Sequence, residues 1–461
     1  MTLGAAIRIF LGQGGLTTMK IGQQVYEQQL TKDPEILDAL SNLLDNEDPL
    51  PKTAVFTILQ HADLLSEGKA ANDKRASIAQ VEECLGHASV KQTHRCVLDT
   101  GKVAAAKIAR PGLARTFQKD MAALRNMKRG LQRQDVNMPE GFLEQTEHAC
   151  EQEIDFRHEE SAQTAVRKNL EHRHERAVID LAELGSHLPI VVPEIYAMKR
   201  LGEGDIGDVQ VMVEEYVPGL SLKGVESFQH LIAKEEQGSM TLAEHEKLDG
   251  LRKRILEMYG AHAPQVEQSY RKLRTDHLRA QIALEFLTQV TEDGVFHADL
   301  HSGNIIVNLD PLKPSIGFID WGSAGDVSAP TERSLASGFS EFMTELALTA
   351  KGQRRVSRLA EMINGWVSAP TESVETWSTH LERLLETKQG VSEFFKGLFL
   401  EVVGIPNVTI HPQFRIFLKG LASAGSHLEK INTATLMSSP NATLKGMALL
   451  HRNPGLQALV A

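Results

Sequence analysis

Two short apolar runs, each interrupted by polar side chains, place the strongest constraint on this chain. The runs are FHADLHSGNIIV at 296–307, with His297, Asp299, His301 and Asn304, and IGFIDWGSAGD at 316–326, with Asp320. A loop that offers a carboxylate and then an amide can hold a hydroxyl group and a metal ion side by side. Phosphoryl transfer asks for this set, because its chemistry is mostly positioning and charge neutralisation around magnesium-bound phosphates. The runs therefore predict a phosphoryl-transfer site in which Asp299 orients the nucleophile and Asn304 and Asp320 bind Mg²⁺.

Two other interpretations of these runs stay open. Asp, Asn and Gly form turns for purely local reasons, so the polar residues can be read as turn formers. His297, Asp299 and His301 can also be read as zinc ligands, although their spacing suits neither a helix face nor a usual zinc hairpin. The second run, with Ile-Asp-Trp-Gly after a short strand, favours phosphoryl transfer over both.

A phosphoryl-transfer site of the kinase kind also needs a lysine for the phosphates and a helical glutamate that holds it. AAAKIARPG at 104–112 places Lys107 at the end of an alanine-rich strand, where a lone charge needs a partner. The helix predicted after it offers Glu153, Asp155, Glu159 and Glu160. Glu153 and Glu160 fall on one helix face and Glu159 close to it, and we interpret Glu160 as a solvated surface residue.

The order of the predicted elements indicates a small mixed lobe joined to a larger helical one. Helices are predicted at 1–48 and 113–183 and dominate from 240 onward, and strands are predicted at 77–85, 93–112 and 209–219, with a hairpin turn at 99–101. We therefore expect an α+β, bilobal fold. Its expected parts are an N-terminal helical extension at 1–50, a small lobe with inserted helices at 51–215 and a helical lobe at 216–461.

Composition excludes several classes of function. The net charge of −11 argues against broad, charge-driven binding to nucleic acid or anionic lipid. No apolar run is long enough to span a membrane, and the first residues do not resemble a signal peptide. The cysteines Cys84, Cys96 and Cys150 are too few for a disulfide framework, so we expect free, buried thiols in a reducing compartment such as the cytoplasm. A Cys84–Cys96 disulfide across a hairpin is the alternative.

The order of these motifs resembles the UbiB/AarF (ADCK-like) family of atypical protein-kinase-like proteins, which is associated with ubiquinone (coenzyme Q) biosynthesis. The matching segments are KIGQ at 20–23, ASIAQV at 76–81, KIARPG at 107–112, EIDFRHE at 153–159, FHADLHSGN at 296–304 and IDWG at 319–322. They span roughly residues 15–430 in the family's order. The resemblance implies a bilobal protein-kinase-like fold that binds ATP or ADP with Mg²⁺.

By position, the resemblance implies a role for each matching residue. Lys107 binds nucleotide phosphates and pairs with Glu159, and Asp299 is the catalytic aspartate beside the magnesium ligands Asn304 and Asp320. Further nucleotide-binding positions are Ala76, Ser77, Ile78, Ala79 and Gln80 over the phosphates, and Glu214, Glu215, Tyr216 and Val217 as the hinge that reads adenine.

The resemblance also brings the N-terminal segment into the site. Lys20 and Gln23 are expected to reach the nucleotide from an added helix, with Lys20 facing Glu153 and Asp155. In this family that helix occludes the place where a protein substrate would lie. Resemblance to it therefore argues against ordinary protein-kinase activity.

Three functional hypotheses follow, and the first is favoured. It is a Mg²⁺-dependent atypical kinase or ATPase linked to ubiquinone or other isoprenoid-lipid metabolism, with a quinone-precursor ligand and peripheral membrane contact left open. The second is a small-molecule kinase of the choline or aminoglycoside phosphotransferase type, whose loop Leu300 fits better than the family's proline, but which has no place for KIGQ or ASIAQV. The third is a nucleotide-gated binding protein with little turnover.

Overall fold

The structure, a computed structural model, describes residues 49–66, 76–87, 90–132, 147, 151, 154–174, 188–202, 208–329, 332–350, 356–368, 373–387, 391–403 and 409–431. The predicted extension at 1–50 lies almost wholly outside them. The chain divides into two compact units. Of the described residues, the first unit holds those up to Ser161 and those within Glu194–Tyr216 and Leu400–Thr409. The second unit holds the described residues within Ala162–Pro193 and Val217–Phe399 and those from Ile410 onward.

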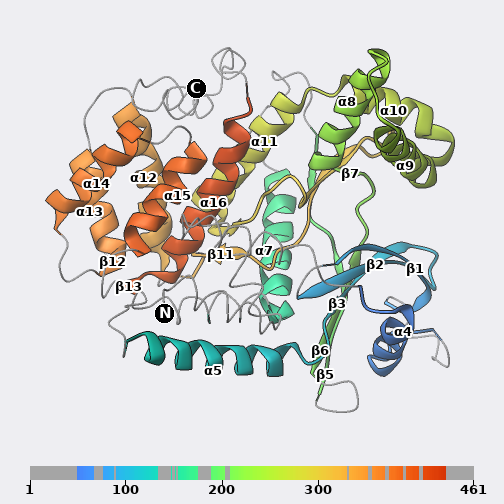
Figure 1. Cartoon of the computed structure of the whole chain (residues 1–461), viewed down its shortest axis with the longest axis horizontal. Helices are drawn as coiled ribbons and strands as arrows, with labels where there is room; N and C mark the ends of the chain where they lie inside the picture. The colour runs from blue at the N-terminus through green and yellow to red at the C-terminus, as the bar shows by residue number, and fades with distance from the viewer. Residues whose placement is uncertain are drawn as a thin grey trace. The chain divides into compact units, whose positions relative to one another are not determined.

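A five-stranded antiparallel sheet is the frame of the first unit (Figure 1). In chain order its strands are β1 (Ile78–His87), β2 (Lys91–Leu98), β3 (Val103–Ala109), β5 (Ile195–Leu201) and β6 (Val209–Glu215), and their spatial order is β1-β2-β3-β6-β5. The predicted turn between β2 and β3 is confirmed: Gly101 has φ +78° and its N–H donates to Leu98 at 2.8 Å. Strand β5 was not predicted, because its sequence, IYAMKRL, does not alternate apolar and polar residues, and in the structure no residue of it is fully buried.

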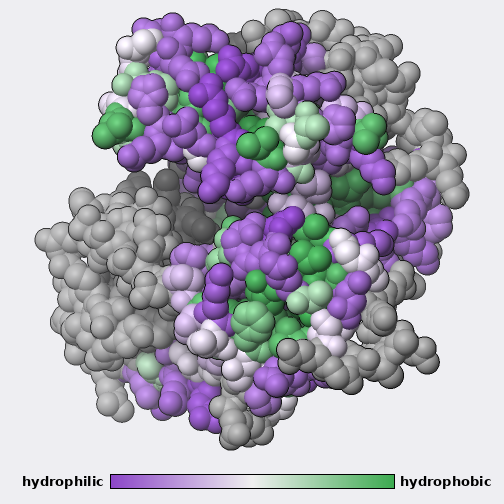
Figure 2. Space-filling view, turned by 90° about the vertical axis from the view of Figure 1, so that its right-hand side faces the viewer, coloured by the Kyte–Doolittle hydropathy of each residue, from purple (hydrophilic) through white to green (hydrophobic). Residues whose placement is uncertain are grey.

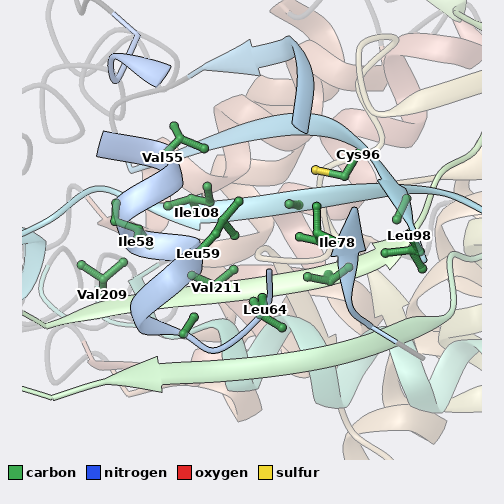
Figure 3. Close-up of a cluster of buried hydrophobic side chains, with 14 residues drawn as sticks. Val55, Ile58, Leu59, Leu64, Ile78, Cys96, Leu98, Ile108, Val209 and Val211 are labelled. Atoms are coloured by element: carbon green, nitrogen blue, oxygen red, sulfur yellow. The ribbon is translucent and has the colours of Figure 1, made fainter. Parts of the chain in front are cut away.

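One face of this sheet is closed by helix α4 (Lys52–His61). Val55, Ile58 and Leu59 recur at helical spacing, are fully buried and belong to one core with Ile108 and Val211 of the strands (Figure 3). Each such side chain contributes about 1.5–3 kcal/mol through burial. The apolar core of the unit therefore lies on the α4 side of the sheet.

The predicted helical stretch at 113–183 contains two helices, α5 (Leu113–Gln132) and α7 (Phe156–His174). Helix α5 begins directly after Pro111 and Gly112, where the glycine has φ +73°. The division between the units falls inside α7, after Ser161.

The two apolar runs at 296–307 and 316–326 form short strands of the second unit. A four-stranded sheet has the order β4-β10-β9-β7, and a two-stranded sheet pairs β11 with β8. The strands are β4 (Ile190–Val191), β7 (Leu220–Ser221), β8 (Val295–His297), β9 (Ile305–Asn308), β10 (Ser315–Phe318) and β11 (Ala324–Asp326). His297 is thus the last residue of β8, and the other predicted polar residues lie in the connections between strands: Asp299, His301, Asn304 and Asp320.

Most of the remaining described elements are helices, as predicted. They are α8 (Leu222–Glu236), α9 (Leu242–Tyr259), η2 (Gly260–His262), α10 (Ala263–Lys272), α11 (Thr275–Thr288), η3 (Gln289–Asp293), α12 (Arg333–Ala350), α13 (Val356–Trp366), α14 (Val374–Thr387), α15 (Val391–Val403) and α16 (Pro412–Leu428), with the short strands β12 (Val367–Ser368) and β13 (Thr409–Ile410). Helix α11 is buried along most of its length and packs against α16. It continues into η3, a π-helical turn that ends at Gly294 with φ +73°.

The surface over α9 is mainly hydrophilic (Figure 2). Leu242 and Leu256 of α9 are exposed there as single apolar side chains. Among the described residues, no helix combines the length and apolarity that a membrane span requires. The fold is of the α+β class that the sequence predicts.

The two described cysteines are free thiols. In the β1–β2 pairing Cys84 lies opposite His94 and Cys96 lies opposite Val81, so the alternative of a Cys84–Cys96 disulfide is wrong. Cys96 is buried as expected, and burial raises its pKa to about 12, which makes it unreactive. Cys84 is only half-buried, contrary to expectation, because it lies in the edge strand β1, where no residue after Ile78 is buried.

Candidate active site

Three buried charges and one half-buried charge gather on the first unit's sheet. We call them the Lys107 cluster: the buried Lys107, Glu159 and Glu214, and the half-buried Lys91. Lys107 Nζ lies 2.5 Å from Glu159 Oε1 and 2.8 Å from Glu214 Oε1. Lys91 Nζ lies 2.8 Å from Glu159 Oε2. The pairing of Lys107 with Glu159 that the resemblance implies is therefore present. Because two cations meet two anions, the cluster carries no net charge, which is the condition for burying such groups.

Strand alternation puts three members of the cluster on one face. Lys107 lies opposite Thr93, two residues from Lys91 on β2. Glu214 lies opposite Ala105, two residues from Lys107 on β3. Since successive side chains point to opposite faces of a sheet, these three share a face, and Ile108 turns to the other face with the α4 core.

The fourth member, Glu159, is positioned by the start of α7. The Gln210 side chain on β6 accepts from Phe156 N–H at 3.0 Å and donates to the Ile154 carbonyl at 2.8 Å. Phe156 is fully buried against Met212 of the sheet. Glu159 follows Phe156 by three residues, on the same side of the helix, so this clamp turns its carboxylate toward Lys107.

The predicted nucleotide loop and hinge fall at strand ends. Ala76 and Ser77 precede β1, while Ile78, Ala79 and Gln80 already belong to it. Ile78 is a core residue, and Ser77 is fully buried, with an Oγ that has no hydrogen-bond partner among the described residues.

In the hinge, Glu214 sends its carboxylate into the Lys107 cluster, a contact that sequence reasoning missed. Glu215 donates its N–H to the Glu194 carbonyl at 2.7 Å, and the Tyr216 ring lies 5.6 Å from the Arg95 guanidinium. Val217 is half-buried. Lys91 was also missed, although the sequence held a signal for it. Thr93 lies opposite Lys107 across the hairpin, and Lys91 is two residues from Thr93, so it lies on the same face of the sheet as Lys107.

Of the residues expected around the N-terminal helix, Lys20, Gln23 and Glu153 lie outside the described residues. Asp155 is described, and both of its carboxylate oxygens accept from Arg157 Nε at 2.9 Å. The hydrogen bonds from Arg157 hold the pKa of Asp155 below its usual range.

In the second unit, His297 at the end of β8 ties two loops together. Its Nδ1 accepts from Asp299 N–H at 3.1 Å, and its Nε2 donates to the Ile319 carbonyl at 3.1 Å. The ring is fully buried, 4.5 Å from the Trp321 ring between centroids, and burial lowers its pKa. His297 is therefore a neutral structural link between the two loops.

The same two loops position the predicted catalytic and metal-binding residues. Asn304 Nδ2 donates to the Asp299 carbonyl at 3.1 Å, and the Asn304 carbonyl accepts from Ile319 N–H at 3.0 Å. Asp320 follows directly, in a left-handed conformation with φ +63°. A non-glycine residue there is unusual, and such strain concentrates at functional sites.

The donor set fits Mg²⁺ shared with a phosphate ligand. With Nδ2 bonded to the loop, Asn304 offers Oδ1, and Asp320 offers a carboxylate, both hard oxygen donors. Within the described part of the chain, no three His, Cys, Asp or Glu side chains are grouped to hold a metal by themselves. Mg²⁺ usually takes one or two carboxylates and completes its shell with water and phosphate.

The zinc interpretation is wrong. Both ring nitrogens of His297 are engaged with the backbone, and His301 Nδ1 accepts from Gly303 N–H at 3.0 Å. These bonds close two local turns, and they leave the histidines apart from any shared metal position.

Helix α16 contacts the loop of Asp299 through a second buried histidine. His427 is buried, donates from Nε2 to the Leu300 carbonyl at 2.5 Å and accepts at Nδ1 from Arg279 at 2.8 Å. Arg279 in turn bonds to Glu226 of α8. Burial lowers the pKa of His427 to about 4, so the ring is neutral in the folded protein.

Several curated proteins are similar to this chain over most of its length. A "Probable protein kinase UbiB" of Pseudomonas putida is 27% identical over 380 residues, which cover 81% of this chain and 56% of that protein. Proteins of the same name from Erwinia tasmaniensis and Vibrio vulnificus are 25% and 24% identical, covering 80% of this chain and 55% of each relative. The chain thus spans about half the length of the curated relatives it matches.

Among solved structures, the complex of Rv3197 with erythromycin from Mycobacterium tuberculosis is similar, with a TM-score of 0.43 and 16% identity, covering 100% of this chain and 93% of that one. The model of the ABC1 atypical kinase-like domain matches residues 60–348, which include the Lys107 cluster and both loops of the second unit. This match favours neither a choline nor an aminoglycoside phosphotransferase. The chain belongs to the ABC1 atypical kinase-like domain family and has its bilobal, α+β kinase-like fold.

Proposed function

We propose that this chain is a Mg²⁺-dependent, ATP-binding kinase or ATPase of the UbiB type. The observation that carries the proposal is the pair of loops at 297–304 and 319–323, which orient one half-buried carboxylate and two oxygen donors for a cation. Phosphoryl transfer needs little covalent chemistry from a protein, so orientation and electrostatics supply most of the rate enhancement.

Each site residue has a role that follows from its surroundings. Lys107 binds nucleotide phosphate, and Glu159 keeps its buried ammonium charged and oriented. Asp299 orients the attacking hydroxyl or water and takes its proton at the carboxylate. Asn304 and Asp320 hold Mg²⁺, which neutralises phosphate charge when bound. The hinge at 214–217 offers backbone groups to adenine.

The acceptor is the finer part of the proposal. The relatives carry the name UbiB, and the resemblance of the motifs links that family to ubiquinone biosynthesis. We therefore propose a phenolic quinone precursor, or another isoprenoid lipid, as acceptor or as activating ligand. The protein then works in the cytoplasm, with peripheral contact to a membrane that carries the lipid.

The test is nucleotide binding and ATP hydrolysis by purified protein, with and without detergent-solubilised quinone-precursor phenols. Asp299→Asn should lower turnover about 100-fold or more, in line with loss of a general base, and leave ATP affinity within about threefold. Asp310→Asn is the matched control, because Asp310 is also a half-buried loop aspartate but caps the Leu312 N–H in the β9–β10 turn.

The outcomes separate the hypotheses. ATP binding that EDTA does not weaken, or an Asp299→Asn variant as active as Asp310→Asn, would reject the site. Tight, Mg²⁺-dependent binding without turnover under any condition would instead favour the nucleotide-gated binding protein.

A further inference from the structure

A lysine from outside every motif contacts the proposed catalytic aspartate. Lys419 Nζ, on α16, lies 3.2 Å from Asp299 Oδ2 and 2.8 Å from Ser323 Oγ. Ser323 lies three residues after Asp320, and its carbonyl accepts from Ala298 N–H at 2.9 Å. One ammonium thus joins the loop of the catalytic aspartate to the loop of the metal ligand.

The helix that carries Lys419 is fixed against this loop. At Gly420 an added Cβ would lie 2.6 Å from the Phe286 ring of α11 and 3.4 Å from Ala298 Cα, so only glycine lets α16 approach so closely. Farther along α16, His427 bonds to the Leu300 carbonyl. Because these two contacts hold the helix in place, the lysine is held at Asp299 by the fold rather than by the ion pair alone.

The two loops supply no such cation themselves. Between Phe296 and Asp326 the one lysine or arginine is Lys313, which is exposed in the turn between β9 and β10. Lys419 comes from 120 positions beyond Asp299. Together, Asp299 and Asp320 put two negative charges where a polyanionic phosphate must approach, which favours a cation from the protein in addition to any metal ion.

We propose that Lys419 is a phosphate-binding residue, and that its ammonium contacts the terminal phosphate of a bound nucleoside triphosphate beside Asp299. This inference rests on the proposed function and adds a residue to it. Asp299 and Ser323 hold the ammonium in place. With 41% of the Lys419 side chain and 34% of the Asp299 side chain exposed, a phosphate oxygen can reach both from solvent.

The competing explanation is a plain ion pair that fastens α16 to the loop. The two explanations differ in which nucleotide they affect. A contact to the terminal phosphate acts on ATP and not on ADP, whereas a fastener acts on both or on neither. The comparison of the two nucleotides is therefore the decisive measurement, and it does not depend on turnover.

The experiment measures the affinity of the full chain for a non-hydrolysable ATP analogue and for ADP, each with Mg²⁺, by calorimetry. Lys419→Met should weaken the ATP analogue about 10-fold, as for loss of one charge-assisted hydrogen bond, and change ADP less than about twofold. Lys419→Arg should recover most of the loss. Lys396→Met is the matched control, because the Lys396 side chain of α15 is also 41% exposed and ion-paired, with Glu393 at 3.3 Å.

Three results would overturn the inference: equal weakening of both nucleotides, no change in either, or the same change in Lys396→Met. If the parent chain binds both nucleotides and Lys419→Met behaves like it, the inference fails and the proposed function stands. If the parent chain binds neither nucleotide, both fail together.

Discussion

Lys91 lies 2.8 Å from Oε2 of Glu159, while the other oxygen of the same carboxylate binds Lys107 at 2.5 Å. Lys107 in turn is shared between Glu159 and Glu214. Each inner member of the cluster thus has two partners of opposite charge. Removal of any one member leaves an odd charge in a region where Lys107 is 4% and Glu159 is 1% exposed.

Glu159→Gln should therefore destabilise the first unit by about 3 kcal/mol, the low end for breaking a buried pair, because Glu214 still holds Lys107. Nucleotide affinity should fall as well, since the ammonium loses its main orienting partner. Urea unfolding and calorimetry measure the two effects. The half-exposed neighbour Glu160→Gln should stay within about 0.5 kcal/mol of the parent, and the reverse ranking would mean that the wrong glutamate has been chosen.

Substitution of the two lysines of the cluster should have different effects on ATP affinity. Lys107→Met should weaken ATP binding about 30-fold or more, because it removes the phosphate contact. Lys91→Met should lower the free energy of unfolding by about 1 kcal/mol and leave ATP affinity within about threefold, because the Lys91 ammonium donates to Glu159 rather than to the nucleotide. Calorimetric titration of both variants checks this. Equal losses of affinity would show that Lys91 also binds phosphate.

The left-handed backbone at Asp320 allows the metal role and the strain to be measured apart. Asp320→Asn keeps a residue that tolerates φ +63°, whereas Asp320→Ala should unfold with about 1 kcal/mol less stability than the Asn variant. Both should lose the Mg²⁺ dependence of nucleotide binding, measured by thermal shift with and without EDTA. Asp63, with φ +53° on the α4 side of the first unit, is the control: Asp63→Ala and Asp63→Asn should show the same strain difference and unchanged Mg²⁺ dependence.

His427 should make the protein sensitive to acid. Its folded pKa is about 4, whereas a histidine in the unfolded chain has a pKa of about 6.5. Between these values the unfolded chain binds a proton that the folded protein cannot, so this contribution is complete above pH 6.5 and is lost as pH falls toward 4. From pH 7.5 to 4.5 the loss is about 2–3 kcal/mol in urea unfolding.

His427→Gln separates that contribution from other acid effects. A glutamine can still donate to Leu300 and accept from Arg279, but it does not titrate. The loss of stability between the two pH values should be smaller by about 2–3 kcal/mol in this variant than in the parent. His245→Gln, at an exposed position of α9, should lose as much as the parent. Identical slopes in all three proteins would contradict the prediction.

Local patterns predict the parts of this molecule that local chemistry determines. The β2–β3 turn follows from Asp99-Thr100-Gly101, and the loop around Asn304 follows from its own turn-forming residues. Lys419 could not be predicted, because its contact with Asp299 joins positions 120 residues apart and an isolated lysine on a helix is usually solvated. Burial of Glu214 was missed for a related reason: only the pairing of β6 with β3 brings it to Lys107.

The division between the units could not be read from the sequence either. The described residues within 162–193 were expected in the small lobe but group with the second unit. Boundaries are recognised by glycine, proline and polar linkers. Here the boundary falls after Ser161, inside the continuous helix α7, where no such signal exists.

The π-helical turn η3 determines how a change in chain length would be absorbed. A π turn holds one residue more than an α-helical turn of the same height, and here it lies directly before the strand that carries His297. Deletion of the exposed Thr291 should therefore shorten η3 to an ordinary turn and leave the strand in register. Deletion of Val295 within β8 would instead exchange the faces of Phe296 and His297, because strand side chains alternate. Thermal unfolding should rank the first deletion as much the milder, which makes this turn a length buffer between a buried helix and the loop that carries Asp299.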